Sequence, residues 1–379
     1  MTGSAPRVRR SSHRLADGRE IVYFDDSPPF ADGTERVVHD TRPLERAEQA
    51  GEVRRDPLTG EWVALAAHRL NRTFMPPADE CPLCPTGRGT VPSEVPSDDY
   101  DVVVFENRFP SFSMHPHGTS GLVDGDPIWP VEPAAGRCEV ICFSSDHGTS
   151  FGHLPVERVR TVVEAWADRT AELSALGPVQ QVFPFENRGR EIGVTLHHPH
   201  GQIYAYPFVP PRSEVVLRQA ELHRRATGGS LLADVLTAER RAGTRVVLSG
   251  EHWTAYVPAA ARWPVEVHLA PHRDVPDLAA LDEAERDELA HVYLELMQRL
   301  DRYFPGEDGG ELLLPYIAGW QQAPLDERRE LGRLHLQVMS VLRAPGRLKY
   351  LAGSESGAGA WVNDTTPERI ADRLREVAG

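Results

Sequence analysis

The sequence has few cysteines, no long apolar run and almost no lysine. Four cysteines in 379 residues are too few for a disulfide framework. No apolar run is long enough to span a bilayer, and the basic N-terminal stretch from Arg7 to Arg14 lacks the apolar segment that a secretory signal requires. These absences predict a cytoplasmic protein without a membrane partner. Lys349 is the only lysine, so the chain otherwise uses arginine for its fixed positive charges.

An excess of positive charge is also missing. The formal net charge is −15, from 41 lysines and arginines against 56 aspartates and glutamates. A general nucleic-acid-binding protein needs a basic face, because much of its affinity comes from neutralising phosphates. The charge therefore argues against nucleic acid as a partner. It still permits a small anionic ligand, which needs only a local cluster of hydrogen-bond donors.

The organisation along the chain predicts an extension followed by two similar halves. Residues 1–45 are rich in Ser, Asp, Pro and charge and show little periodicity, so we expect an irregular N-terminal extension with at most a short strand at Ile21–Phe24. Beyond it, the order of strands, helix and strands occurs twice, which predicts two related α+β halves at 46–212 and 213–379. The expected helices cover about 155–176 and 282–303, and the expected strands of the second half cover 252–257, 265–269, 312–317 and 333–339.

The most informative stretch is Thr195-Leu196-His197-His198-Pro199-His200-Gly201-Gln202. Aromatic and β-branched residues after Gly201 predict a strand, in which His198, His200 and Gln202 share one face. Imidazole can act as nucleophile, base or metal ligand. The amide of Gln202 can hydrogen-bond a phosphoryl oxygen but cannot supply a proton near neutral pH.

A second motif, Cys81-Pro82-Leu83-Cys84, carries two thiols at a spacing that can bind one tetrahedral zinc ion. A redox pair is the alternative, but such a pair belongs at the start of a helix after a strand, whereas prolines flank this one. The pair supplies half of a zinc site. His147 and His198 are the candidates for the other two ligands, with His153 a weaker substitute for His147. Cys138 and Cys142 share one face of a strand-like segment, and we expect them to be buried core thiols.

The sequence His198-Pro199-His200-Gly201-Gln202 resembles the active-site motif of the galactose-1-phosphate uridylyltransferase family, the transferase branch of the histidine-triad superfamily. Related hydrolases have a further histidine where this chain has Gln202. The resemblance extends over roughly residues 54–355. It implies two histidine-triad-like halves, each a mainly antiparallel sheet with covering helices, and a homodimer with shared active sites.

The resemblance also implies roles for individual residues. His200 would be the nucleophile and Gln202 its partner, and zinc would be bound by Cys81, Cys84, His147 and His198. The expected substrate contacts are Arg69, Arg72, Asn107, Asn187, Thr195, Lys349 and Glu355. Two positions depart from the family pattern, because Arg108 stands where an aspartate is common and Ser354 replaces a tyrosine.

Some family members have a second metal site that includes histidines where this chain has Gln321 and Gln337. We therefore expect no iron-type site in the second half, and we expect His335 to be a buried or hydrogen-bonded histidine.

The implied reaction is UDP-glucose + galactose 1-phosphate ⇌ glucose 1-phosphate + UDP-galactose, proceeding through a uridylyl-histidine. UDP-glucose, UDP-galactose and hexose 1-phosphates are then the expected partners. Two alternatives stay open on sequence grounds. One is another nucleotidyltransferase or phosphorylase of the superfamily that uses an ADP-sugar, and the other is a zinc-stabilised nucleotide-binding protein without catalysis.

Overall fold

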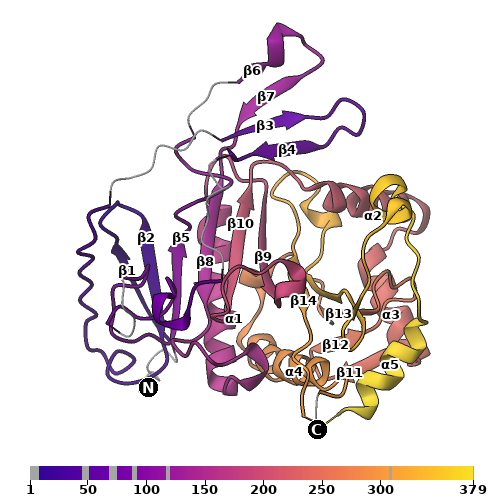
Figure 1. Ribbon diagram of the computed structural model, residues 1–379. Helices are drawn as coiled ribbons and strands as arrows, with labels where there is room; N and C mark the ends of the chain where they lie inside the picture. The colour runs from indigo at the N-terminus through magenta and orange to yellow at the C-terminus, as the bar shows by residue number, and fades with distance from the viewer. Residues whose placement is uncertain are drawn as a thin grey trace, which may run out of the picture.

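The computed structural model describes residues 8–44, 51–67, 75–87, 92–116, 120–306 and 310–378. Its main sheet (Figure 1) contains β1 (Arg9–Arg14), β2 (Glu20–Asp25), β5 (Val102–Glu106), β8 (Arg137–Cys142), β9 (Gln181–Arg188), β10 (His200–Tyr206), β11 (Val246–Ser249), β12 (Trp253–Tyr256), β13 (Val265–Pro271), β14 (Tyr316–Gln321) and β15 (His335–Ser340). These eleven strands are antiparallel throughout and lie in the order β1-β2-β5-β8-β10-β9-β14-β15-β13-β12-β11.

The helices are α1 (Val156–Ser174), α2 (Pro211–Thr227), α3 (Leu231–Ala242), α4 (Glu283–Asp301) and α5 (Pro367–Glu376). A smaller sheet of β3 (Glu52–Arg55), β4 (Trp62–Leu65), β6 (Gly121–Leu122) and β7 (Pro130–Pro133) projects from one end of the molecule (Figure 1), and β16 (Leu342–Ala344) forms a hairpin with β17 (Arg347–Leu348). Within the described ranges, no helix combines the length and the apolar character needed to cross a bilayer.

The main sheet repeats itself about the central pair β9 and β14. Moving outward, β10 matches β15, β8 matches β13 and β5 matches β12, while α1 and α4 follow β8 and β13 in the chain and pack against each other. The register agrees with this symmetry. Gln202 pairs with Phe185, Gln337 pairs with Gly319, and Phe185 pairs with Gly319. The predicted fold class, two related α+β halves with antiparallel strands, is confirmed.

Helix α1 covers one face of the first half and leaves the other face for a site. Val159, Val162, Val163 and Trp166 recur at helical spacing and are buried, as the sequence predicted. They belong to the same apolar core as the inward side chains of β8 and β10, such as Ile203. Because strand side chains alternate, His200 and Gln202 of β10 point away from α1.

The N-terminal extension is more regular than the sequence predicted. The strand expected at Ile21–Phe24 is confirmed as part of β2, which pairs with β5 and buries these residues. The expectation of an otherwise irregular segment is wrong, because β1 forms a hairpin with β2 at the edge of the sheet. Its sequence, Arg-Arg-Ser-Ser-His-Arg, has no apolar alternation. Backbone hydrogen bonds to β2 hold it in place, and these leave no mark on the side-chain pattern.

One strand of the second half is displaced from its predicted place. The sequence predicted a strand at 312–317, but β14 begins at Tyr316. Pro315 has no N–H to donate, and the N–H of Leu314 donates to the Asp301 carboxylate at 3.3 Å. The backbone before Tyr316 is therefore engaged elsewhere. The helices expected at 155–176 and 282–303 and the strands expected near 252–257, 265–269 and 333–339 are confirmed.

Candidate active site and metal centre

Four potential metal ligands converge at one end of β8 and β10. They are Cys81, Cys84, His147 and His198, and their ligand atoms all lie within 4.8 Å of one another. The Cys84 Sγ atom lies 3.4 Å from His147 Nδ1 and 3.5 Å from His198 Nδ1. The structure therefore brings together the four residues that the sequence selected, and two thiols with two imidazoles form a donor set that suits a metal ion.

The surroundings of His198 fix which nitrogen faces the cluster. His198 Nε2 lies 2.8 Å from the carbonyl oxygen of Ser144 and 2.8 Å from the hydroxyl oxygen of Tyr100. The Tyr100 hydroxyl donates to the carbonyl of Leu83 at 2.8 Å. The Nε2–H group then donates to Ser144, and the Nδ1 lone pair is left for a metal ion. Burial also lowers the pKa of His198 to about 3, which keeps the ring neutral.

The other residues considered for the metal site lie outside the cluster. His153 contacts the Ser150 hydroxyl at 2.9 Å through Nδ1 and the Glu311 carboxylate at 3.0 Å through Nε2, on an exposed turn. His147 is thus the better candidate of the two. Cys138 and Cys142 are fully buried in β8 and form no disulfide, as predicted for core thiols. Burial raises the pKa of Cys142, so this thiol stays protonated.

His200 is the first residue of β10 and stands beside the cluster. Its Nδ1 atom lies 2.7 Å from the carbonyl oxygen of His198, so Nδ1–H donates there and Nε2 carries the free lone pair. Burial lowers the pKa of His200, which favours the neutral ring. Gly201 allows close packing behind this side chain, because a Cβ atom at this position would lie 2.8 Å from the carbonyl oxygen of Phe185 and 2.9 Å from the ring of Phe143.

A cavity of about 250 Å³ opens in front of His200. Gln202, Asn107 and Thr195 contribute polar groups, and Phe105, Val140 and Leu196 are among its apolar lining. Pro82 and Leu83, from the loop that carries the two cysteine ligands, form part of the wall. An apolar cleft with a few convergent polar groups is typical of a small-molecule site.

The remaining predicted contacts fall into three groups. Asn187 lies two residues beyond Phe185, the partner of Gln202, and is therefore on the His200 face of the sheet but outside the cavity lining. Lys349 and Glu355 also lie outside the lining, and they bind each other at 3.1 Å. Arg69 and Arg72 lie outside the described residues.

Sequence reasoning missed two residues of this region. Tyr100 supports His198 from 98 positions away in the chain, and no spacing rule could connect them. Glu94 lines the cavity. It is a single carboxylate in a loop, and only its contacts in the folded chain distinguish it from the other acidic residues.

The second half contains a related but different arrangement. His335 is buried, and its Nδ1 atom lies 3.0 Å from the carbonyl oxygen of Arg333, which repeats the hydrogen bond of His200. Gln337 lies beside it, with 3.3 Å between the Nε2 atoms of the two side chains. Burial lowers the pKa of His335 to about 3. The prediction of a buried, hydrogen-bonded histidine is confirmed.

A neutral imidazole beside a cavity with amide and hydroxyl donors, on a duplicated antiparallel α+β fold, defines a nucleotidyltransferase of the histidine-triad type. Sequence profiles of the N-terminal and C-terminal domains of galactose-1-phosphate uridyl transferase match residues 42–210 and 216–379. The chain belongs to the galactose-1-phosphate uridylyltransferase family. Its activity is that of a UDP-glucose–hexose-1-phosphate uridylyltransferase in galactose metabolism, which the similarity favours over the non-catalytic and ADP-sugar alternatives.

Individual relatives agree with this assignment. The galactose-1-phosphate uridylyltransferase of Streptomyces lividans is 50% identical over 98% of this chain and 98% of its own. The enzyme of the same name from Thermotoga maritima is 36% identical, over 86% of this chain and 98% of its own. A solved uridylyltransferase structure, 31% identical, superposes with a TM-score of 0.76 over 86% of this chain and 98% of that one.

Proposed function

We propose that His200 is the nucleophile of a two-step transfer. Its Nε2 atom attacks the α-phosphorus of UDP-glucose, forming an N–P bond, while the P–O bond to glucose 1-phosphate breaks and the leaving oxygen keeps the electron pair. An oxygen of galactose 1-phosphate then attacks the same phosphorus. The N–P bond breaks, and UDP-galactose leaves with the neutral imidazole restored.

The hydrogen bond between His200 Nδ1 and the carbonyl of His198 carries this proposal. This hydrogen bond fixes the tautomer in which Nε2 is nucleophilic. The carbonyl oxygen also stabilises the positive charge that develops on the ring during attack. The leaving group is a sugar phosphate, which departs as an anion with little help from an acid. An amide at position 202 is therefore sufficient. It donates to a non-bridging phosphoryl oxygen and stabilises the charge there.

Five further residues complete the proposed substrate site of one protomer. Asn107 and Thr195 line the cavity and donate to the nucleotide. Asn187 lies on the same face of the sheet as His200 and is proposed as a further contact to the nucleotide. Arg69 and Arg72 are proposed as a phosphate clamp, because guanidinium groups match phosphate oxygens bidentately.

We propose that the four-residue cluster binds zinc. Two thiolates and two neutral imidazoles are typical of closed, tetrahedral zinc sites. When bound, the ion supplies structural cross-linking rather than an open coordination position. His198 would hold it through Nδ1, two residues before His200, so the metal would help to fix the start of β10 and the direction of the nucleophile.

We also propose a homodimer in which the active sites are shared. Lys349 and Glu355 are bound to each other away from the cavity of their own protomer. In the dimer, this pair would reach the sugar phosphate bound at the other protomer. We place the domain boundaries at residues 45 and 212, so that the metal cluster and nucleophile belong to 46–212 and Lys349 belongs to 213–379. The four cysteines form no disulfide in the described structure, which suits a reducing compartment, and we expect the enzyme to act in the cytoplasm.

Intact-protein mass spectrometry after incubation with UDP-glucose alone tests the mechanism. The wild type should gain one uridylyl group, and His200→Ala should gain none while still binding UDP-glucose. Absence of the adduct in the wild type, or its presence in the variant, would contradict His200 as the nucleophile.

A further inference from the structure

Glu94 is the one carboxylate among the described residues that line the His200 cavity. Its side chain is only 12% exposed and touches three arginines. Arg19 Nη2 lies 2.6 Å from Oε2, Arg42 Nη1 lies 3.0 Å from Oε1, and Arg108 Nη1 lies 3.7 Å from Oε1. Arg108 belongs to the cavity wall, whereas the other two arginines come from the segment before residue 45.

Arg19 does not line the cavity itself but bonds Glu94, which does. It is 5% exposed and lies directly after the Asp17-Gly18 turn that joins β1 to β2. Its Nε atom donates to Asp17 at 2.7 Å, and its Nη1 atom donates to the backbone carbonyl of Glu106 at 2.8 Å. Glu106 immediately precedes Asn107, so one guanidinium contacts both the Glu94 carboxylate and the backbone that carries a proposed substrate contact.

Arg42 is also held in place by specific hydrogen bonds. Its Nε and Nη2 atoms each donate to the Asp40 carboxylate at 2.8 Å, in a bidentate pair. Asp40 also accepts a hydrogen bond from the backbone N–H of Ala16 at 3.0 Å. These bonds lower the pKa of Asp40, despite its partial burial, and raise that of Arg42. The pair stays charged across the working pH range.

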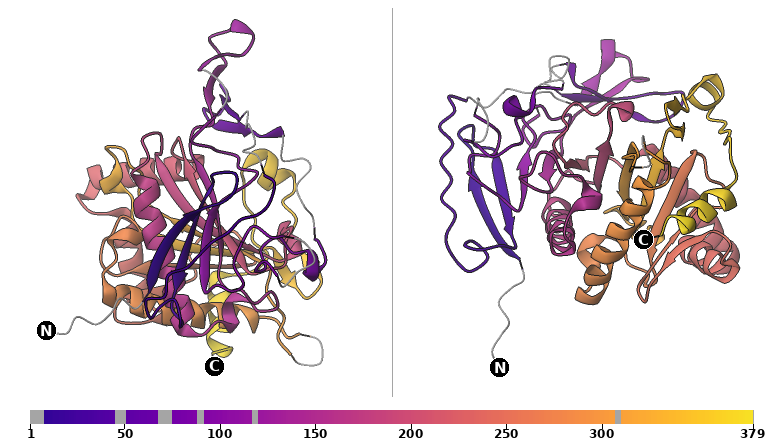
Figure 2. Two further views of the ribbon diagram at one scale, coloured as in Figure 1. Left: turned by 90° about the vertical axis from the view of Figure 1, so that its left-hand side faces the viewer. Right: turned by 60° about the horizontal axis from the view of Figure 1, so that its bottom comes forward.

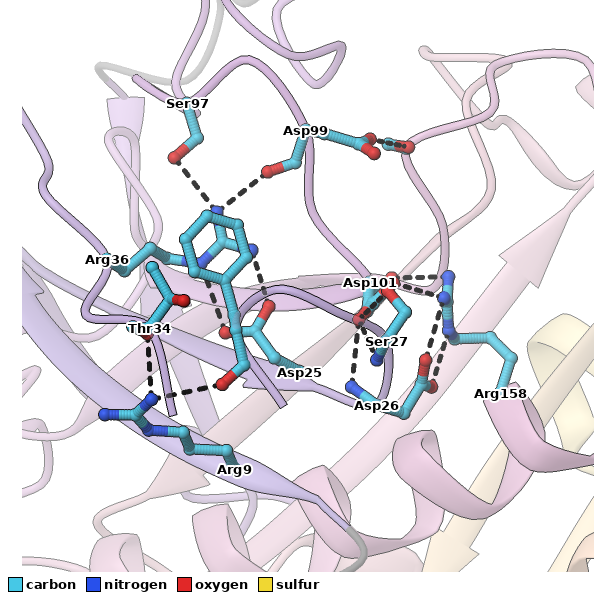
Figure 3. A network of polar contacts seen from close by, with 12 residues as sticks. Arg9, Asp25, Asp26, Ser27, Thr34, Arg36, Ser97, Asp99, Asp101 and Arg158 are labelled. Carbon is cyan, nitrogen blue, oxygen red and sulfur yellow. Dashed lines mark hydrogen bonds and ion pairs between the residues drawn. The ribbon is translucent and has the colours of Figure 1, made fainter. Parts of the chain in front are cut away.

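The extension is fastened to the catalytic half independently of Glu94 (Figure 3). Arg36 forms a buried ion pair with Asp25 inside the extension, at 3.1 Å, and its guanidinium also donates to the carbonyl of Asp99 in the catalytic half at 2.9 Å. Arg158 of α1 donates to Asp26 at 2.8 Å and also binds Asp101, just before β5. Figure 2 shows the N-terminal strands β1 and β2 forming one edge of the main sheet. These contacts attach the described part of the extension firmly to the catalytic half.

We infer that Arg19 and Arg42 are positioning residues of the nucleotide-sugar site, acting through Glu94 on Arg108 and on the end of β5. Two buried guanidinium groups fix the Glu94 carboxylate, and that carboxylate sets where Arg108 stands on the cavity wall. The matched N-terminal family profile begins at residue 42, so Arg19 lies in a part of the chain that the profile does not reach. The inference rests on the proposed role of the His200 cavity.

Loss of either arginine changes the charge of the cavity as well as its shape. When a buried carboxylate loses a positively charged partner, its negative charge is no longer fully compensated. It then draws Arg108 toward itself and repels the phosphates of a nucleotide sugar. The ion pairs from Arg19 and Arg42 to Glu94, and from Glu94 to Arg108, do not run through His200 or Gln202, so the chemical step itself should be spared.

The test is steady-state kinetics of Arg19→Gln, Glu94→Gln and the double variant. Arg19→Gln should raise KM for UDP-glucose by about tenfold with kcat changed by less than about twofold, the pattern of lost binding that is uniform along the reaction. The double variant should be no worse than the worse single variant, because both changes disrupt one network. If Arg19→Gln does not fold, Arg42→Gln tests the same network in the same assay, because Arg42 also pairs with Glu94.

Arg9→Gln is the matched control, because Arg9 belongs to the same extension but bonds only the carbonyls of Phe30 and Thr34 in the described structure. It should leave KM unchanged. Asn107→Ala separates the two levels of the proposal. If KM rises in Asn107→Ala but is unchanged in the Arg19 and Arg42 variants, the positioning role is wrong and the cavity assignment stands. An unchanged KM in all of them overturns the cavity assignment as well, and additive effects of Arg19→Gln and Glu94→Gln overturn the coupling.

Discussion

At the scale of single residues, the proposed metal site predicts that losing one ligand lowers both the metal content and the stability of the protein. In the proposed zinc site Cys81 is one of four ligands, so its replacement would leave an incomplete donor set. We expect Cys81→Ser to lose most of its bound zinc and to melt at a lower temperature, by on the order of 2 °C for each kcal/mol of lost stability. Elemental analysis and thermal unfolding measure both effects.

Cys138→Ser is the natural comparison for that experiment, since Cys138 is equally buried but lies outside the cluster. It should lose some stability and keep its zinc. If Cys81→Ser retained a full equivalent of zinc and the wild-type melting temperature, the assignment of Cys81 as a ligand would be wrong.

Glu186 gives a pH-dependent prediction at the same scale. Burial raises the pKa of this carboxyl from 4.5 to about 7, although Arg188 nearby and a hydrogen bond from the Tyr316 hydroxyl at 2.8 Å oppose the shift. A folded pKa above the unfolded value means that the folded state binds the extra proton. This contribution to stability is complete below about pH 4.5 and disappears as the pH rises through 7.

Glu186→Gln removes the titration but keeps an oxygen that can accept from Tyr316. We expect the wild-type melting temperature to fall relative to that of the variant between pH 5 and 8, by an amount equivalent to roughly 3 kcal/mol at most. Melting curves at several pH values provide the measurement. Parallel wild-type and variant curves across this range would show that Glu186 does not titrate as its burial suggests.

At the scale of elements, strand β10 depends on Gly201 for close packing against β9 and the core. A Cβ atom on Gly201 would press against the carbonyl oxygen of Phe185 and the ring of Phe143. Neither can move without shifting β9 or the core. Gly201→Ala should therefore cost about 1–3 kcal/mol and slow formation of the uridylyl adduct, as thermal unfolding and mass spectrometry can show.

Gly177→Ala is the matched control, because a Cβ atom there meets nothing within 4 Å. It should leave the stability and the adduct close to those of the wild type. Equal behaviour of the two alanine variants would mean that β10 adjusts freely and that close packing behind His200 is not required.

The same elements show what a sequence can and cannot predict. Strands β2, β5, β9 and β10 could be predicted because apolar or aromatic side chains mark them, and helix α1 because its apolar residues recur at helical spacing. Strand β1 could not, since its polar side chains lie at an edge where only backbone bonds hold it. Likewise, the start of β14 is set by Pro315 and by a distant carboxylate on α4.

Residues of the candidate site likewise fall into those that the sequence could predict and those that only the folded structure reveals. Local motifs identified His200, Gln202 and the two cysteines, and the family resemblance selected His147. The supporting contacts of Tyr100, Arg19 and Glu94 join segments far apart in the chain, and their residue types occur many times in the sequence. Such contacts become visible only when the fold brings them together.

At the scale of the whole molecule, the residues proposed to bind the sugar phosphate lie away from the His200 cavity of the same chain. Lys349 is 7% exposed and binds Glu355 at 3.1 Å and the carbonyl of Val362. None of these three residues lines the His200 cavity. The proposed shared-site dimer would resolve this separation, because the nucleophile of one protomer could then work with Lys349 of the other.

Complementation between two inactive variants tests this arrangement. His200→Ala and Lys349→Ala should each be inactive alone, but subunits mixed by co-expression should recover activity. Half of a random mixture is heterodimer, and each heterodimer has one site with both residues intact, so about a quarter of the wild-type activity is expected. Recovery requires that His200 and Lys349 of one site come from different protomers. A mixture that stays inactive, although its heterodimers are isolated by two affinity tags, would show that each protomer builds its site alone.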